Sequence, residues 1–124
     1  MAALAKNRKT PERIAELRQL EAGGKIYTGG MVAVNADGKA VPASDTEGLT
    51  VIGVALTSAA AGGMVTVKSS CFKFAFDGTL TGAVIGKEVF VKDDQTVALT
   101  STNSIPAGTV FDVDGKGVWV IVGK

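Results

Sequence analysis

From residue 25 onward the chain consists of short valine-rich runs, separated by glycine-containing turns about every 8–12 residues. Within the runs, apolar residues recur at every second position. This spacing suits a strand with one buried face, whereas a helix would need a repeat of about 3.6 residues. Sixteen glycines among 124 residues also disfavour long helices. The pattern therefore predicts a mainly β fold, either a small β-sandwich or a β-barrel.

The turns between the runs bound the expected strands. Asp37-Gly38 and Asp114-Gly115 each stand between alternating apolar runs, which is a strong hairpin signal. Asp93-Asp94 separates two further runs. The strands are expected at residues 25–28, 31–35, 39–41, 51–56, 64–68, 72–76, 88–92, 96–99, 109–113 and 117–122.

The N-terminal part differs from the rest in charge, and all three arginines lie in the first 18 residues. Residues 1–25 hold six basic and three acidic residues, a net charge of +3, whereas residues 26–124 hold seven lysines and nine acidic residues, a net charge of −2. We therefore predict two parts, a basic N-terminal arm over residues 1–24 and a β-rich domain over residues 25–124.

A short helix is predicted in this arm. Thr10 is a favourable N-cap, Pro11 suits the first helical position, and Gly23-Gly24 would end the helix. A helix of about ten residues is marginal alone in water, so it should lie against its own domain, a sister subunit or a partner. Its apolar stripe would consist of Ile14, Leu17 and Leu20.

The last predicted strand, the run VWVIV at residues 118–122, is apolar on both faces. A half-exposed antiparallel strand alternates apolar with polar residues instead. Trp119 and Ile121 are therefore expected either inside a two-layer packing or at a subunit contact, and we expect a homo-oligomer.

Residues that could carry chemistry are scarce. The chain has no histidine, one cysteine and scattered carboxylates, which excludes a Ser-His-Asp triad, a Cys-His pair and a zinc site. Cys71 is expected to be a small buried hydrophobic residue. Asp93-Asp94 and Asp112-x-Asp114 lack the spacing of a calcium loop. We therefore predict no catalytic residue, no metal and no cofactor.

Composition also limits the partners. A net charge of +1 provides no long-range field that would attract nucleic acid. No apolar run approaches the roughly 20 residues that cross a bilayer. The charged residues 6–9 do not resemble a secretory signal. We therefore expect synthesis in the cytoplasm, with neither nucleic acid nor membrane as a partner.

Four short motifs resemble those of the small tailed-phage capsid cement, or head decoration, proteins. In that family a G-x-x-V strand is followed by [IV]-G-V-A, a short alanine-rich stretch, G-x-x-V-x-V and later G-x-x-V-[FY]-V. The corresponding segments here are residues 30–34, 52–55, 62–67 and 86–91. The resemblance covers about residues 26–122.

This resemblance implies a β-rich module, commonly a trimer, that binds the major capsid protein on the outer surface of the virion and stabilises the mature shell. The basic arm and the last strand are then the expected contacts with the shell or a sister subunit. The candidate residues are Arg8, Lys9, Arg13, Ile14, Leu17, Arg18 and Trp119.

Other classes of function remain open. One is a phage tail or baseplate module, or a carbohydrate-binding β-module, although one Trp and one Tyr supply few aromatic rings for a sugar. Another is a carrier or regulatory barrel that presents a lysine at a hairpin such as Lys92-Asp93-Asp94.

Overall fold

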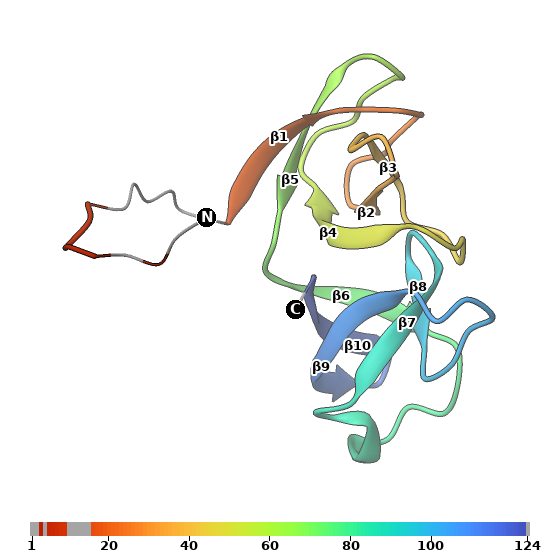
Figure 1. Ribbon diagram of the computed structural model, residues 1–124. Coiled ribbons are helices and arrows are strands. Elements are labelled where there is room, and N and C mark those ends of the chain that lie inside the picture. Colours follow the sequence, from red (N-terminus) through yellow and green to blue (C-terminus); the bar gives the residue numbers. More distant parts are fainter. Residues whose placement is uncertain (1–2, 4, 10–15, 124) are drawn as a thin grey trace.

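The computed structural model describes residues 3, 5–9 and 16–123, and within them the protein is mainly β. Figure 1 shows two groups of strands, one above the other, with residues 5–9 at the far left, apart from both. The strands are β1 (Leu17–Glu21), β2 (Met31–Val34), β3 (Ala40–Pro42), β4 (Thr50–Ala55), β5 (Met64–Lys68), β6 (Cys71–Phe76), β7 (Glu88–Asp93), β8 (Thr96–Ala98), β9 (Pro106–Asp114) and β10 (Gly117–Val122), with a single 3-10 turn, η1 (Gly82–Val84), before β7.

The two groups are a five-stranded sheet and a closed barrel. The sheet has the order β1-β5-β4-β2-β3, and the barrel has the order β10-β6-β8-β7-β9. Strands β6 and β8 pair in parallel, and the other strand pairs are antiparallel. An isolated bridge between Ala22 and Ala40 brings the end of β1 against β3, so the first sheet also curls.

Two apolar clusters hold this arrangement together. The larger one joins the first sheet to the barrel, since Met31, Ala33, Val51 and Val54 pack with the barrel residues Phe74, Val89, Val91, Val97, Val110, Val118, Val120 and Val122. The smaller one fills the curl of the first sheet and consists of Ala22, Ile26, Val32, Ala40, Ala55, Ala59, Val65 and Val67. No polar or charged side chain in the described part of the chain is buried.

The predicted helix is wrong where the structure can test it. Residues Leu17–Glu21 form strand β1, which pairs antiparallel with β5, with Leu20 opposite Val65. The physical reason is that a short isolated helix is marginal, whereas an edge strand gains a full ladder of hydrogen bonds from its neighbour. Leu20 packs against the smaller cluster. The proposed N-cap, Thr10, and the stripe residue Ile14 lie outside the described residues.

The expected β-domain strands agree more closely with the structure. The expected strand at residues 25–28 is wrong, because this segment makes only an isolated bridge between Ile26 and Ala59. The strands expected at residues 64–68 and 117–122 match β5 and β10 residue for residue, and the others differ at their ends. In the described part of the chain, no helix is long and apolar enough to span a membrane.

Candidate docking surface

The outer side of the barrel carries an exposed apolar patch on β6, β9 and β10. Trp119 is 37% exposed and Phe111 is 63% exposed, whereas Cys71 and Ile121 are half-buried. We call these four residues the aromatic face. Aromatic side chains are enriched at protein interfaces, and an apolar patch that contains them marks a candidate interaction site.

The strand register explains why these side chains point outward. Along β10 the buried residues Val118, Val120 and Val122 alternate with Trp119 and Ile121. Strand β10 pairs with β6, which places Ile121 opposite Cys71. The aromatic face is therefore the solvent side of the strand whose other side lines the barrel.

A β-bulge brings Phe111 to the same side. Trp119 lies opposite Asp112 on β9, but the next residue, Val120, lies opposite Val110, so Phe111 is the extra residue of β9. Val110 is buried, whereas both Phe111 and Asp112 are exposed. A bulge of this kind re-aims a side chain that a regular strand would have turned inward.

Trp119 is held in place by polar neighbours. Its indole Nε1 donates to Asp114 Oδ2 at 3.3 Å, and Lys73 Nζ lies 2.8 Å from the same oxygen. The hydrogen bond from Lys73, then that from the backbone N–H of Lys116, and also that from Trp119 lower the pKa of Asp114 to about 2. The carboxylate is therefore charged at neutral pH and keeps the indole oriented at the surface.

The exposure of Trp119 thus contradicts one of the two expectations for this residue, namely burial inside a two-layer packing. The prediction placed its ring inside a two-layer packing or at a subunit contact, and within one chain the ring is partly exposed. Two-layer packing covers only the valine side of β10, because the barrel interior lies on that side. The subunit contact stays a prediction.

Cys71 is half-buried, not fully buried as expected. Burial, and then the negative charge of Asp112, raise the pKa of its thiol. The protonated thiol is a poor nucleophile, so Cys71 contributes apolar surface to the aromatic face and is not suited to covalent chemistry.

The remaining predicted contact residues lie elsewhere. Arg8 and Lys9 are exposed in the N-terminal segment, and Arg13 and Ile14 are outside the described residues. Leu17 and Arg18 are exposed on β1, in the first sheet, whereas Trp119 is on the barrel. The structure therefore does not bring β1 and Trp119 into one site.

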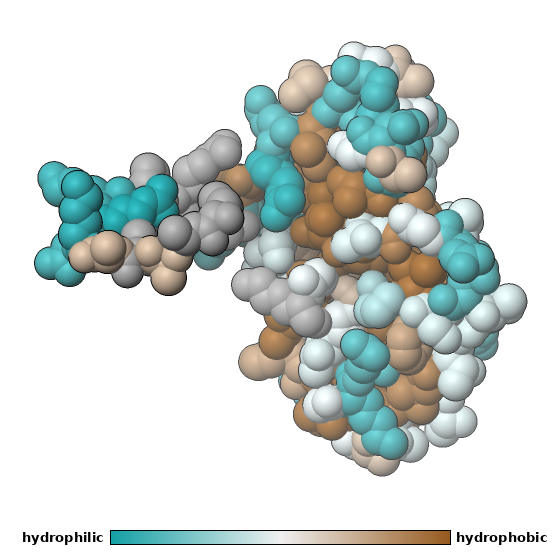
Figure 2. Space-filling view, viewed as in Figure 1, coloured by the Kyte–Doolittle hydropathy of each residue, from teal (hydrophilic) through white to brown (hydrophobic). Residues whose placement is uncertain are grey.

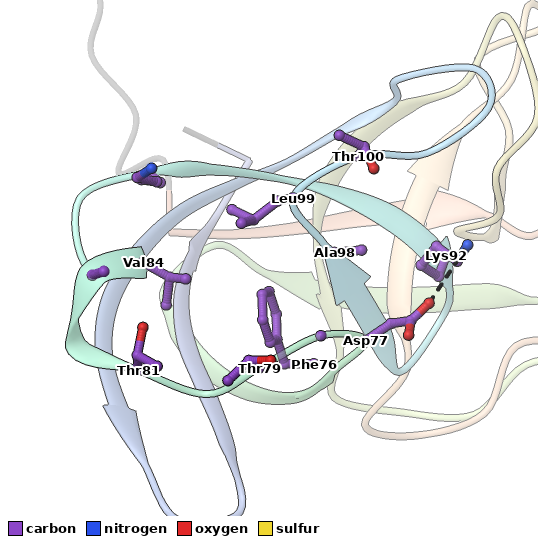
Figure 3. Close-up of a pocket in the computed structure, with 12 residues that line it drawn as sticks. Phe76, Asp77, Thr79, Thr81, Val84, Lys92, Ala98, Leu99 and Thr100 are labelled. Atoms are coloured by element: carbon purple, nitrogen blue, oxygen red, sulfur yellow. Dashed lines mark ion pairs between the residues drawn. The ribbon is translucent and has the colours of Figure 1, made fainter.

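A shallow hollow of about 450 Å³ opens at the end of the barrel between β6, η1, β7 and β8. In Figure 3, Phe76, Val84 and Leu99 surround its apolar part, and Asp77 and Lys92 lie together at one edge. These two charged groups are 3.6 Å apart and form an ion pair. The hollow has no arrangement of nucleophile and base, and the sequence contained no signal for it, because its lining comes from separate turns.

Residues 3, 5–9 and 16–123 contain no group of three or more metal-ligating side chains placed to hold an ion. The aromatic face is the candidate functional surface among the described residues, and its exposed apolar side chains are suited to binding a partner. No family model and no curated protein sequence matches the chain.

Proposed function

We propose that this protein is a structural decoration, or cement, protein of tailed-phage heads. In this proposal it binds the major capsid protein on the outer surface of the virion and stabilises the mature shell, acting as a homotrimer. The observation that carries the proposal is the aromatic face, an apolar surface with two exposed aromatic rings on a small β protein.

The positions of the sequence motifs also support the proposal. The segments at residues 30–34, 52–55, 62–67 and 86–91 coincide with β2, β4, β5 and β7. They supply core residues to both groups of strands, among them Val32, Val54, Val65 and Val89. The resemblance therefore concerns the residues that specify the fold, and the exposed aromatic face is left free for a partner.

The energetic argument concerns Trp119 and Phe111. Interface hot spots are enriched in Trp and other aromatic residues that are well packed once the partner is bound. Trp119 loses little conformational entropy on binding, because Asp114 already orients its indole. A surface with such preorganised anchors and a polar rim of Lys73 and Asp112 has the composition of a docking site.

Co-sedimentation with phage heads tests the proposal. The protein should bind expanded heads made of the major capsid protein encoded with it, and trimers should be visible on the outer surface by electron microscopy. Phe111→Ala with Trp119→Ala should lower occupancy at least about tenfold. Tyr27→Ala is the matched control, because Tyr27 is 63% exposed but lies outside the aromatic face, and it should bind normally. Absence of binding by the unaltered protein would refute the proposal.

The aromatic face also supports a second candidate, a carbohydrate-binding or tail module. Exposed aromatic rings bordered by charged groups are suited to stacking on sugar rings, and Trp119 and Phe111 are such residues. A glycan array would show binding that the Trp119→Ala variant loses. Binding to glycans without binding to heads would favour this candidate.

A further inference from the structure

We propose that the basic segment at residues 5–9 of one copy docks on the aromatic face of a second copy, with Arg8 and Lys9 against Trp119, Phe111 and Asp112. This contact would link copies of the chain to one another. It goes beyond the proposed function and requires no capsid, and it makes the segment of a second copy and the capsid alternative occupants of the aromatic face.

The first observation is the charge at the edge of the aromatic face. Asp112 is exposed and lies opposite Trp119. Its Oδ1 accepts the backbone N–H of Val113, and no ion pair involves Asp112 among the residues that the structure describes. Asp114, by contrast, is already paired with Lys73. A cation that approaches the aromatic rings therefore meets Asp112 as the carboxylate still available to it.

The second observation is the opposite charge of the N-terminal segment. Residues 5–9 are Ala-Lys-Asn-Arg-Lys, with three cations and no acid, and all five are exposed. Residues 16–123 hold eight basic and eleven acidic residues, a net charge of −3. Figure 2 shows the hydrophilic segment at the left, away from the two groups of strands. The opposite signs favour association between copies, and at the aromatic face, where Lys73 is paired with Asp114, Asp112 is the carboxylate that a basic segment could pair with.

The third observation is the type of side chain. Arginine stacks on aromatic faces and pairs with carboxylates at the same time, and lysine also binds favourably over an aromatic ring. The aromatic face places Trp119, Phe111 and Asp112 on neighbouring positions of two paired strands. A short basic peptide can use all three, whereas it would gain little from the apolar surface alone.

A second copy fits better than the chain's own segment. Residues 5–9 precede β1, at the outer strand of the first sheet, and Trp119 lies on the barrel. In Figure 1 the segment lies apart from its own barrel. The segment is thus free to reach a neighbour, and reciprocal or cyclic exchange would join copies into a closed oligomer.

Trp119 is the only tryptophan, so its fluorescence reports directly on the aromatic face. We would measure acrylamide quenching of the full chain at increasing protein concentration, together with its mass by sedimentation. Quenching should fall as the oligomer forms. Arg8→Glu with Lys9→Glu should weaken both changes by about tenfold or more. Lys25→Glu with Lys87→Glu alters the net charge equally at other exposed sites and should have little effect.

Charge exchange gives the decisive comparison. Asp112→Lys alone should also weaken the association, and adding it to Arg8→Glu with Lys9→Glu should restore much of it. The proposal would be overturned if Trp119 of the Arg8→Glu with Lys9→Glu variant were still protected from acrylamide at high protein concentration. Another part of the second copy would then cover Trp119. Protection that depends on Arg8 and Lys9 but not on concentration would also overturn it, since the chain's own segment would be the occupant. The proposal would also be overturned if the protein stayed monomeric, with Trp119 fully accessible, at concentrations up to about 1 mM. The dissociation constant would then be larger than that of a typical specific contact.

Discussion

At the scale of the residue, two glycines allow neighbouring strands to approach closely where their pairing register shifts. Gly53 on β4 and Gly108 on β9 have φ angles of 158° and 154°, and each lies next to a register shift. A Cβ at Gly108 would collide with the carbonyl oxygen of Ile121, and one at Gly53 with that of Lys68. Glycine is needed at both positions because the backbone of a neighbouring segment occupies the space that a Cβ atom would need.

These glycines lead to a first prediction. Gly108→Ala should lower the free energy of unfolding by about 3 kcal/mol or more, since backbone must move to accommodate the methyl group. Gly29→Ala is the control, because Gly29 also has a positive φ, 89°, but an added Cβ would meet nothing within 4 Å. It should cost only about 1 kcal/mol of backbone strain. Urea denaturation measures both, and equal losses would contradict the steric argument.

A second prediction at this scale concerns acid and Trp119. The pKa of Asp114 falls from its ordinary 3.8 to about 2 in the folded protein. Because the folded pKa is the lower one, this stabilisation is complete above the unfolded pKa and is lost as the pH falls through the folded pKa. The fluorescence of Trp119 in the folded protein should therefore change around pH 2, where its hydrogen-bond acceptor is protonated. Asp114→Asn should remove that transition, and a transition unaltered in this variant would assign it to another group.

At the scale of the element, similar turns explain the repeated glycine motifs. Gly29, Gly62 and Gly86 have φ angles of 89°, 86° and 85°. Each is the third residue of a turn closed by a backbone hydrogen bond from the fourth residue to the first: Gly30 to Tyr27, Gly63 to Ala60 and Lys87 to Val84. A positive φ at the third residue requires glycine in such turns. Residues 29–34 (GGMVAV) and 62–67 (GGMVTV) are thus alike because the same kind of turn leads into a strand in both.

Strand β1 gives the prediction at this scale. Removal of residues 1–22 would take away β1, with Leu20 and the buried Ala22, and would leave Val65 and Val67 of β5 at an uncovered edge. We expect a loss of about 3 kcal/mol or more, a large share of the roughly 5–15 kcal/mol typical of a domain. Removal of residues 1–9 is the control and should leave the thermal midpoint unchanged at a protein concentration at which the full chain is monomeric. Equal midpoints for the two truncated chains would show that β1 contributes nothing to the fold.

At the scale of the whole molecule, one aspartate ties the two groups of strands together. Asp45, in the loop after β3, accepts the backbone N–H groups of Thr102 and Asn103 at 3.0 and 2.9 Å. Asn103 Nδ2 donates in return to the carbonyl oxygen of Asp45 at 2.8 Å. These bonds join a loop of the first sheet to the loop between β8 and β9, beside the shared apolar cluster.

The corresponding prediction is that Asp45→Ala destabilises the protein by about 1–3 kcal/mol, because two backbone donors lose a charged acceptor. Hydrogen exchange should increase in residues 99–105. Asp37→Ala, in an exposed turn within the first sheet, should have an effect below about 0.5 kcal/mol. If both variants unfold at the same urea concentration, the hydrogen bonds between Asp45 and the loop between β8 and β9 do not contribute to stability.

The amino-acid sequence by itself determined where most of the strands lie. Strand β5 and strand β10 were predicted with their exact bounds, because an apolar residue at every second position and a turn at each end are local signals. The Phe72-x-Phe74-x-Phe76 run, by the same alternation, contributes to the larger cluster. Local chemistry was sufficient wherever a segment has one apolar side and a clear turn.

Only the tertiary structure decided the state of Leu17–Glu21, the exposure of Trp119 and the closure of the barrel. The residues of Leu17–Glu21 favour a helix by themselves, and the segment is a strand because β5 supplies the hydrogen bonds. Strand β10 is apolar on both sides, but only the side with Val118, Val120 and Val122 is buried, in the interior of the barrel. The pairing of β10 with β6 and the parallel pairing of β6 with β8 join residues far apart in the chain, so no local pattern specifies them. The bulge at Phe111 lies within the β9–β10 hairpin, but the alternation of apolar residues does not indicate it. The aromatic face arises from the bulge and from the pairing of β10 with β6, and for that reason the sequence indicated Trp119 and Ile121 but neither Phe111 nor Cys71.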